Sequence, residues 1–372
     1  MNALCRSVSR LPLWCIAILT FVCNSVFADT AVIDDKELRD ELYESLLKQG
    51  PGDEPSRPFS LVNRGGISLG IYEAGVNWAL LRLLKDFRDD PALAKRLEPE
   101  LYAAAGASAG AINGFLAGLF WCTEANRSGE ASDTLNSNLF RNSWLTIDVN
   151  QLIDHSKDTL PEDNAGFSRA LVRQIQSAVL HEIDNRTFRD GCKVAFGLSL
   201  TRSKPVLISN AGVDIAQQRL VLPMIMKGMN GGDDLRLENL QMPLPDFSTS
   251  GLSELANRPF LSSVVYLDSA ESEPVLESEL TPESVFDAIK ASSSFPIAFA
   301  AKKLSYCIFQ SESLRQTEPE RQRRQPSTVL DKRCPSGYRR LSSHFVDGGV
   351  FDNDPLELVR QLSEQRHTQS RS

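Results

Sequence analysis

The stretch LYAAAGASAG (residues 101–110), continued by AINGFLAGLF (residues 111–120), predicts a strand, a sharp turn and a helix. The turn has the form G-x-S-x-G, which is typical of a nucleophile elbow, a strained strand-to-helix turn that exposes a serine hydroxyl at the end of a sheet. Gly106 and Gly110 let neighbouring backbone pass close to that serine. Ser108 is therefore our candidate nucleophile, and the alternative is a small-residue turn that enters a packed helix.

A serine hydroxyl needs a base that accepts its proton, and the four histidines are poorly placed for that role. His155, His181 and His367 lie in polar or charged surroundings, which are typical of exposed histidines. His344 precedes the short apolar strand FVDGG (residues 345–349), but strand alternation puts it and Asp347 on opposite faces. A Ser-His-Asp triad of the α/β-hydrolase type that uses His344 stays as an alternative.

Asp347 is the better candidate base because it ends an apparent strand directly before Gly348 and Gly349. Active sites of α/β proteins collect at the ends of strands. Desolvation at such a site raises the pKa of a carboxyl group, which makes the carboxylate a stronger base. The alternative is a turn aspartate that bonds its own backbone, which is common in Asp-Gly sequences.

A second strand, loop and helix are predicted upstream, where FSLVN (residues 59–63) leads into RGGISLG (residues 64–70) and a helical pattern from Ile71 to Phe87. Adjacent glycines at a helix start can point successive N–H groups into one concavity, where the helix dipole favours negative charge. The loop has neither G-x-G-x-x-G nor G-x-x-x-x-G-K-[ST], the patterns of nucleotide-binding loops. We therefore expect an oxyanion hole rather than a phosphate site.

Together these motifs resemble those of the patatin-like phospholipase family, in which a glycine-rich loop, a G-x-S-x-G elbow and a D-G-[GA] motif follow one another in that order. The segment ASSSFP (residues 291–296) is similar to one that the family carries between elbow and aspartate. The likeness spans about residues 58–360 and looks most like the bacterial branch. The glycines that match are Gly65, Gly66, Gly70, Gly106, Gly110, Gly348 and Gly349.

The resemblance implies a serine acyl hydrolase of lipid esters, such as a phospholipase A, with a role in lipid degradation and no need for a metal or cofactor. Ser108 would attack the ester and Asp347 would accept the proton. The backbone amides of Gly65, Gly66 and Ile67 would hold the oxyanion. A covalent acyl-enzyme would form and then be hydrolysed by water. The sequence accordingly offers no H-E-x-x-H, paired C-x-x-C or EF-hand pattern.

The glycine-rich loop departs from the family pattern at two positions. Ile67 stands where a third glycine is usual, and Leu69 stands where a basic residue is usual. Without that basic residue, the loop lacks a group that could hold an anionic head group, whereas its N–H donors remain. These departures motivate a third interpretation, a non-catalytic membrane-surface protein on a hydrolase scaffold.

Residues 1–28 have the form of a signal peptide, with Arg6 and Arg10, an apolar stretch over residues 11–22 and a small-residue site before Asp29. The apolar run is shorter than the roughly 20 residues that cross a membrane, and an uncleaved anchor is the alternative. Val22 is too large for the residue expected before a lipidated Cys23. We expect export by a bacterium, to the periplasm, the outer membrane or the medium.

The chain is acidic, because 40 Lys and Arg stand against 48 Asp and Glu for a net charge of −8. Without the two arginines of residues 1–28 the balance is 38 against 48, or −10. This excludes general nucleic-acid binding, which uses a basic face. The expected partner is a lipid or phospholipid substrate, with transient contact to a membrane surface, and the sequence indicates no oligomeric state.

Four of the seven cysteines lie beyond residue 28, and an even number permits disulfides in an oxidising compartment. Cys307 and Cys334 flank a polar insertion, and a bridge between them would close the base of that loop. Cys122 and Cys192 lie in more apolar segments and are predicted to be buried thiols.

Residues 29–57 form a lead-in, and residues 58–372 form one elaborated domain that is large enough for a substantial core. Alternating strands and helices predict an α/β fold, a three-layer α/β/α sandwich with a mostly parallel central sheet. Strands are expected near 193–200, 206–209 and 261–267, and a helix is expected to begin at a Thr281 cap. The segment PMIM (residues 223–226) is either a lid that faces lipid or core packing before a turn.

Residues 311–340 form the polar insertion, whose excess of positive charge indicates either contact with an anionic lipid surface or a solvated loop. Only residues 348–372 follow Asp347. Related bacterial proteins often continue further, so we expect a short form or a fragment that is truncated at its C-terminus.

Overall fold

The computed structural model describes most of the expected domain. The described residues are 56–94, 98–127, 133–145, 167, 170–210, 213–240, 264–266, 279–309, 334 and 338–371. The predicted signal peptide, nearly all of the lead-in and most of the polar insertion lie outside these residues. The predictions made for those three segments therefore stay predictions.

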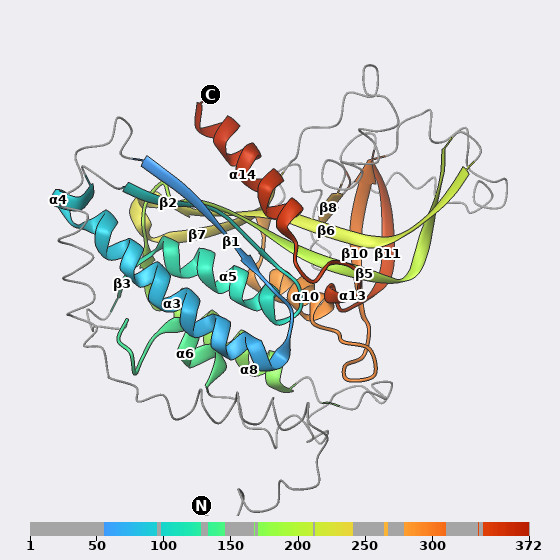
Figure 1. Cartoon of the computed structure of the whole chain (residues 1–372), viewed down its shortest axis with the longest axis horizontal. Coiled ribbons are helices and arrows are strands. Elements are labelled where there is room, and N and C mark those ends of the chain that lie inside the picture. The colour runs from blue at the N-terminus through green and yellow to red at the C-terminus, as the bar shows by residue number, and fades with distance from the viewer. Residues whose placement is uncertain are drawn as a thin grey trace, which may run out of the picture.

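Strands and helices alternate only in the first part of the chain (Figure 1). The strands are β1 (Ser56–Asn63), β2 (Glu98–Gly106), β3 (Thr123–Asn126), β4 (Arg186–Phe188), β5 (Lys193–Asn210), β6 (Val213–Met229), β7 (Asp234–Asn239), β8 (Val264–Tyr266), β9 (Glu279–Leu280), β10 (Lys302–Phe309) and β11 (Tyr338–Val346). The helices are α3 (Ile67–Asp89), α4 (Pro91–Ala94), α5 (Ala109–Cys122), α6 (Leu139–Trp144), α8 (Ala170–Asp184), α10 (Pro282–Ser292), α13 (Gly349–Asp352) and α14 (Leu356–Arg371).

Nine of the described strands form one mixed sheet. Its hydrogen-bonded order is β8-β10-β11-β5-β6-β7-β9, and β1 joins it through β2, which pairs with β5. The β1–β2 and β2–β5 pairs are parallel, whereas every pair within the order β8-β10-β11-β5-β6-β7-β9 is antiparallel. The expectation of a mostly parallel sheet is therefore wrong. The reason is that β5 and β6 form a long hairpin where a parallel sheet would need a helical crossover.

Helices cover both faces of this sheet, so the three-layer α/β/α arrangement is confirmed (Figure 1). Alternate residues of β2 show the two faces. Ala103 and Ala105 belong to the core formed with Leu358 and Leu362 of α14, whereas Ala104 between them belongs to the larger core on the side of α5. Because both faces of the second half of β2 are buried, residues 103–106 form a continuous run of small side chains rather than an alternating pattern.

Helix α5 lies at the centre of the larger core. Every one of its residues is buried, as is typical of a helix that is apolar all round. Its Phe115 makes edge-on ring contacts with Phe196 of β5 and Phe286 of α10. This packing fixes the helix whose first residue follows Ser108.

The register of β5 explains how distant motifs meet. On one edge of β5, Gly106 at the end of β2 lies opposite Leu198, and Val346 at the end of β11 lies opposite Thr201. The two strands run in opposite directions, so their carboxyl ends approach each other along the same edge. Because a strand rises about 3.3 Å per residue, the two chain segments leave the sheet within about 10 Å of each other.

Other expectations have mixed outcomes. Residues 193–200 and 206–209 belong to one strand, β5, and Thr281 caps α10 by accepting a hydrogen bond from the Ser284 amide (3.2 Å). The segment PMIM lies inside β6, with Met224 and Met226 fully buried. Core packing is therefore correct for this segment, and the lid interpretation is wrong.

The described part of the chain contains two disulfides. Cys307–Cys334 is the bridge expected at the base of the polar insertion. Cys122 and Cys192 are buried as expected, but they are bonded to each other, so the prediction of free thiols is wrong. An apolar sequence context predicts burial and does not distinguish a thiol from a bridge. This second disulfide ties the end of α5 to the start of β5.

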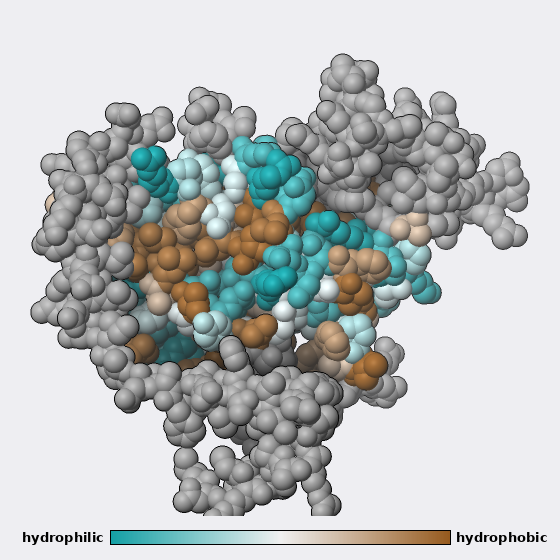
Figure 2. Space-filling model, in the orientation of Figure 1, coloured by the Kyte–Doolittle hydropathy of each residue, from teal (hydrophilic) through white to brown (hydrophobic). Residues whose placement is uncertain are grey.

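The face shown in Figure 2 carries apolar residues among polar ones, including in the area of α3. Leu69, Val76 and Leu80 of that helix are exposed. They form a stripe, named here the α3 stripe, that begins beside the glycine-rich loop. Within the part of the chain that the structure describes, no helix is long and apolar enough to span a membrane.

Candidate active site

The predicted elbow is present. Strand β2 ends at Gly106, α5 begins at Ala109, and Ser108 between them has φ 56° and ψ −125°. Positive φ costs a non-glycine residue about 1–3 kcal/mol and is common at functional sites. A Cβ on Gly106 would lie 2.0 Å from the Gly110 carbonyl oxygen, and one on Gly110 would lie 2.2 Å from the carbonyl oxygen of Asn63. Both glycines are therefore needed for the turn to close.

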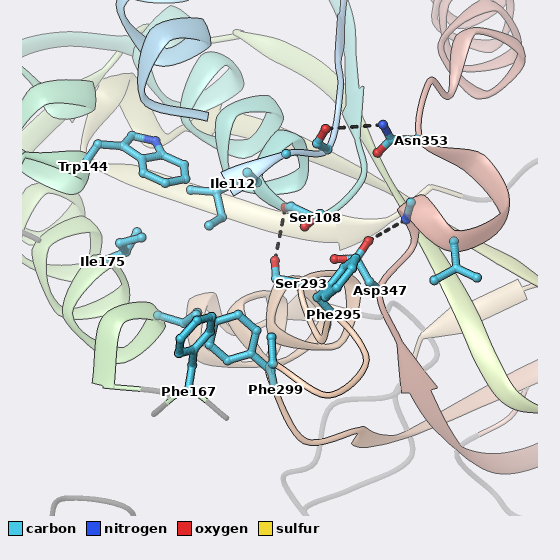
Figure 3. Close-up of a pocket in the computed structure, with 17 residues that line it drawn as sticks. Ser108, Ile112, Trp144, Phe167, Ile175, Ser293, Phe295, Phe299, Asp347 and Asn353 are labelled. Atoms are coloured by element: carbon cyan, nitrogen blue, oxygen red, sulfur yellow. Dashed lines mark hydrogen bonds between the residues drawn. The ribbon is translucent and has the colours of Figure 1, made fainter. Parts of the chain in front are cut away.

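Asp347 lies directly after β11 and faces Ser108 (Figure 3). Its side chain is buried, with 2% of the residue surface exposed. One carboxylate oxygen, Oδ1, accepts a hydrogen bond from the Gly349 amide (2.7 Å). The other, Oδ2, is buried and has no hydrogen-bond partner within the described structure. Asp347 therefore keeps one acceptor available for a proton.

Burial raises the pKa of Asp347 above its ordinary value of 3.8. The Ser108 hydroxyl and the Gly349 amide act in the opposite direction, because both donate toward the charged form. The hydroxyl faces the carboxylate without making a hydrogen bond of ordinary geometry. Such contacts are often loose in an enzyme without substrate and tighten when substrate binds.

Three serines at the end of α10 hold the nucleophile and the aspartate in place. We call residues Ser292–Ser294 the serine turn. Ser292 Oγ accepts from the Ser108 amide (3.1 Å), and Ser293 Oγ donates to the Ser108 carbonyl (3.1 Å). The carbonyls of Ser294 and Ser292 accept from the amides of Asp347 (2.8 Å) and Gly348 (2.9 Å). One short segment thus positions both sides of the candidate dyad.

The glycine-rich loop lies beside Ser108. Gly66 has φ 147°, a conformation that L side chains rarely adopt, and it precedes the first turn of α3. The Gly65 amide donates a long hydrogen bond to the Asn353 carbonyl (3.4 Å), and Asn353 Nδ2 donates to the Gly65 carbonyl (3.3 Å). Among the described residues, no such partner is found for the amides of Gly66 and Ile67.

Helix dipoles add to these donors. Helices α3 and α5 both begin at the site, α3 directly after Gly66 and α5 directly after Ser108. A helix N-terminus carries about half a positive charge and free N–H groups. The site can therefore stabilise an oxyanion that develops beside Ser108, without any cationic side chain.

Ser108 and Asp347 open into a pocket of about 480 Å³. Its walls are mainly apolar and come from α5, α6, α8 and the segment after the serine turn (Figure 3). They include Ile112, Trp144, Phe167, Ile175, Phe295 and Phe299. The polar groups are confined to the end at which Ser108, Asp347 and Gly66 lie. This shape suits a ligand with a polar reacting end and a long apolar part.

The comparison with known families agrees with this geometry. The family model for patatin-like phospholipase matches residues 61–360. The chain belongs to the patatin-like phospholipase family. No curated protein and no solved structure matches it. Membership in the family supports a lipid hydrolase and lipid substrates.

In this patatin-like chain, the positions of the described histidines do not support a Ser-His-Asp triad. His344 is exposed on β11, and His181 is exposed on α8; neither lines the pocket. His155 lies outside the described residues, and the side chain of His367 is not described. In the part of the chain that the structure describes, no three His, Cys, Asp or Glu side chains gather as metal ligands would.

The patatin-like site also uses residues to which sequence reasoning gave no role. The serine turn was noted only as a segment of small residues before Phe295 and Pro296. Asn353, which braces Gly65, lies just after α13 and carries no pattern of its own. A run of three serines at the end of a helix is the signal that could have indicated bonds to the backbone, because serine hydroxyls readily bond nearby backbone groups.

Proposed function

We propose that this patatin-like protein hydrolyses lipid esters with a Ser108–Asp347 dyad and a covalent acyl-enzyme. The observation that carries the proposal is the buried Oδ2 of Asp347, which has no partner among the described residues and faces the Ser108 hydroxyl at the polar end of an apolar pocket. A carboxylate whose pKa is raised by burial is a better base than an exposed one.

In the first step, Ser108 Oγ attacks the ester carbonyl carbon and its proton passes to Asp347 Oδ2. The oxyanion lies against the amides of Gly66 and Ile67. The bond to the alcohol breaks, and Asp347 returns the proton to the leaving alkoxide oxygen, which leaves the acyl group on Ser108. In the second step, Asp347 takes a proton from water, the hydroxide attacks the acyl-enzyme, and the proton returns to Ser108 as the fatty acid leaves.

The pocket and its rim favour a lipid. An acyl chain would lie between Trp144, Ile175 and Phe299. At the rim, Phe295 is exposed, and Ile297 is 92% exposed with φ 74°. Together with the α3 stripe, these side chains would make transient contact with a lipid surface, because apolar groups leave water when they enter it.

The two disulfides support export. Disulfides form and persist in oxidising compartments and are rare in the cytosol. The structure has Cys122–Cys192 and Cys307–Cys334. We therefore propose that the chain acts in the periplasm, at the outer membrane or outside the cell.

The test is covalent labelling of the purified chain with a fluorophosphonate, followed by mass spectrometry, together with turnover of p-nitrophenyl esters and phospholipids. The wild type should carry the phosphonate on Ser108, and Ser108→Ala should carry none. Asp347→Asn should lower kcat by about 10³–10⁴-fold. His344→Ala should leave kcat unchanged.

Three outcomes would change the proposal. A folded wild-type chain that neither labels nor turns over esters would favour a binding protein on a hydrolase scaffold. Loss of turnover in folded His344→Ala would replace the dyad with a triad. Labelling at a serine other than Ser108 would remove the assigned nucleophile.

A further inference from the structure

A buried polar network lies behind the elbow, between α3, α5 and α6. Its centre is Asn113 of α5, which has no exposed surface. Asn113 Oδ1 accepts a hydrogen bond from Trp144 Nε1 (2.8 Å). Its Nδ2 donates to the Gly70 carbonyl and to Glu73 Oε2, both at 2.9 Å. Both amide protons and the amide oxygen are therefore used.

The partners fix the orientation of the Asn113 amide. If the amide were turned over, its donors would face the Trp144 N–H, and its oxygen would face the acceptors of Gly70 and Glu73. Such an arrangement would leave buried groups unpaired, at a cost of about 1–3 kcal/mol each. The network is therefore compatible with one geometry only.

The network reaches the glycine-rich loop through Glu73. While Glu73 Oε2 accepts from Asn113, Oε1 accepts from the Arg64 backbone amide (2.9 Å). Arg64 directly precedes Gly65 and Gly66. A continuous set of hydrogen bonds thus runs from Trp144 in the pocket wall, through the helix that begins after Ser108, to the start of the oxyanion loop.

Packing at the same place leaves little room for adjustment. A Cβ on Gly70 would lie 2.9 Å from the ring of Trp144 and 2.9 Å from Ala109 Cβ. The first turns of α3 and α5 therefore approach as closely as side chains permit. Any shift of Asn113 would move the oxyanion donors relative to Ser108. The reason is that Asn113 bonds Gly70 and Glu73 of α3, and Glu73 in turn bonds the Arg64 amide at the start of the loop.

We propose that Asn113 and Glu73 are positioning residues that hold the oxyanion loop and the Trp144 wall at their working distance from Ser108. The proposal rests on the proposed function, because the geometry that it concerns is that of ester cleavage. Neither side chain touches the substrate in this scheme. Misplacement of reacting groups by about 1 Å can cost about 100-fold in rate.

The experiment reverses the direction of one hydrogen bond. Asn113→Asp places carboxylate oxygens against the acceptors of Gly70 and Glu73, and Glu73→Gln can satisfy only one of its two donors. In the double variant, the new carboxylate accepts from the new amide, whose oxygen still accepts from Arg64. We expect labelling of Ser108 by the fluorophosphonate to slow by about 100-fold in Asn113→Asp and by about 10-fold in Glu73→Gln. The double variant should recover at least 10-fold over Asn113→Asp.

Asn239→Asp is the matched control. Asn239 is also a buried asparagine, and it bonds the backbone of Tyr266, with Nδ2 donating (2.9 Å) and Oδ1 accepting (2.8 Å), away from the pocket. The Asn239→Asp variant should lower the Tm as Asn113→Asp does, while its kcat and labelling rate stay within about twofold of wild type. Asn113→Asp should lower kcat more than it changes KM. It should also shift the preferred acyl length, because the new carboxylate is repelled by the Gly70 carbonyl and Glu73 and moves together with Trp144, whose Nε1 donates to it.

Hydrogen exchange of the peptide that covers residues 64–72 gives a readout independent of activity. Exchange should be faster in Asn113→Asp and Glu73→Gln than in the Asn239→Asp control, and slower again in the double variant. Equal exchange in all variants, or equal loss of labelling in Asn113→Asp and Asn239→Asp, would overturn the positioning role. An inactive wild type with the expected exchange pattern would instead refute the proposed function and keep the structural link.

Discussion

Replacing the candidate base should stabilise the protein while it removes activity. Asp347 is buried, and its Oδ2 has no hydrogen-bond partner in the described structure. In Asp347→Asn the amide oxygen can still accept from the Gly349 amide, which donates to Oδ1 in the wild type. The amide nitrogen would take the place of Oδ2 and could donate to the Ser108 hydroxyl. The variant therefore satisfies a position that the wild type leaves unpaired.

The size of the stabilisation expected for Asp347→Asn follows from the unpaired Oδ2 of the wild type. A buried polar group without a partner costs about 1–3 kcal/mol, and a charged one costs more. A gain of about 2 kcal/mol in the free energy of unfolding would raise the Tm by about 3 °C in a domain as large as residues 58–372. Ser108→Ala is the inactive control, because it keeps the buried carboxylate and should show no such gain.

The gain should depend on pH. Burial raises the pKa of Asp347 above 3.8 in the folded state, so that between 3.8 and the folded pKa the native chain binds more protons than the unfolded chain. The stability of the wild type therefore falls as the pH rises through that window. Asp347→Asn lacks this fall. The difference between the two proteins should be smallest below pH 3.8 and largest at neutral pH.

The assay is reversible urea unfolding at several pH values under non-reducing conditions, with calorimetry for the Tm. Equal m-values in wild type and variant would show that the change lies in stability rather than in compactness. An Asp347→Asn protein that is less stable than wild type at pH 7, or a gain that does not shrink in acid, would refute the reasoning. Either result would mean that the carboxylate is satisfied in solution.

Three further predictions concern the surroundings of the dyad. Gly66→Ala should fold but cost about 1–3 kcal/mol in urea unfolding and lower kcat, because φ 147° strains any L side chain and the loop must shift. Ser292→Ala leaves the Ser108 amide and the Ser199 carbonyl without their shared partner, so stability should fall by about 1–3 kcal/mol and the labelling rate should fall with it; an unchanged labelling rate would show that Ser292 does not position the nucleophile. The double change Cys122→Ser with Cys192→Ser opens a loop of 70 residues and should lower the free energy of unfolding by about 2–4 kcal/mol, measured against the reduced and oxidised wild type.

The parts of the site that could be predicted are those with local steric signatures. The elbow needs glycine on both sides of Ser108, and the structure shows the backbone contacts that require it. Asp347 was predicted from its place between a strand and two glycines, and it does lie directly after the last residue of β11. Such short motifs can be recognised in a sequence because close approach between two backbone segments requires small residues at fixed positions.

What could not be predicted depends on contacts between distant segments. The serine turn meets Ser108 across 184 and 185 residues, and serine hydroxyls in a sequence do not show which backbone they bond. The β5–β6 hairpin was missed because the segment 223–226 was interpreted as a lid or as core packing before a turn, whereas Pro223 lies within β6 opposite Gly197. The sequence predicted β1, β2, β5, β8 and the end of β11 but not β6, β7 or β10, and the directions of the strands were set by pairing that no local pattern encodes.

The serine turn has a consequence for protein engineering. A dyad is usually treated as two side chains that can be grafted together onto a new scaffold. Here Ser292–Ser294 bonds the backbone on both sides of the pair, so Ser108 and Asp347 share one support. A graft of this dyad would need three segments, and a scaffold that supplies only the elbow and the strand end would leave each partner free to move independently of the other.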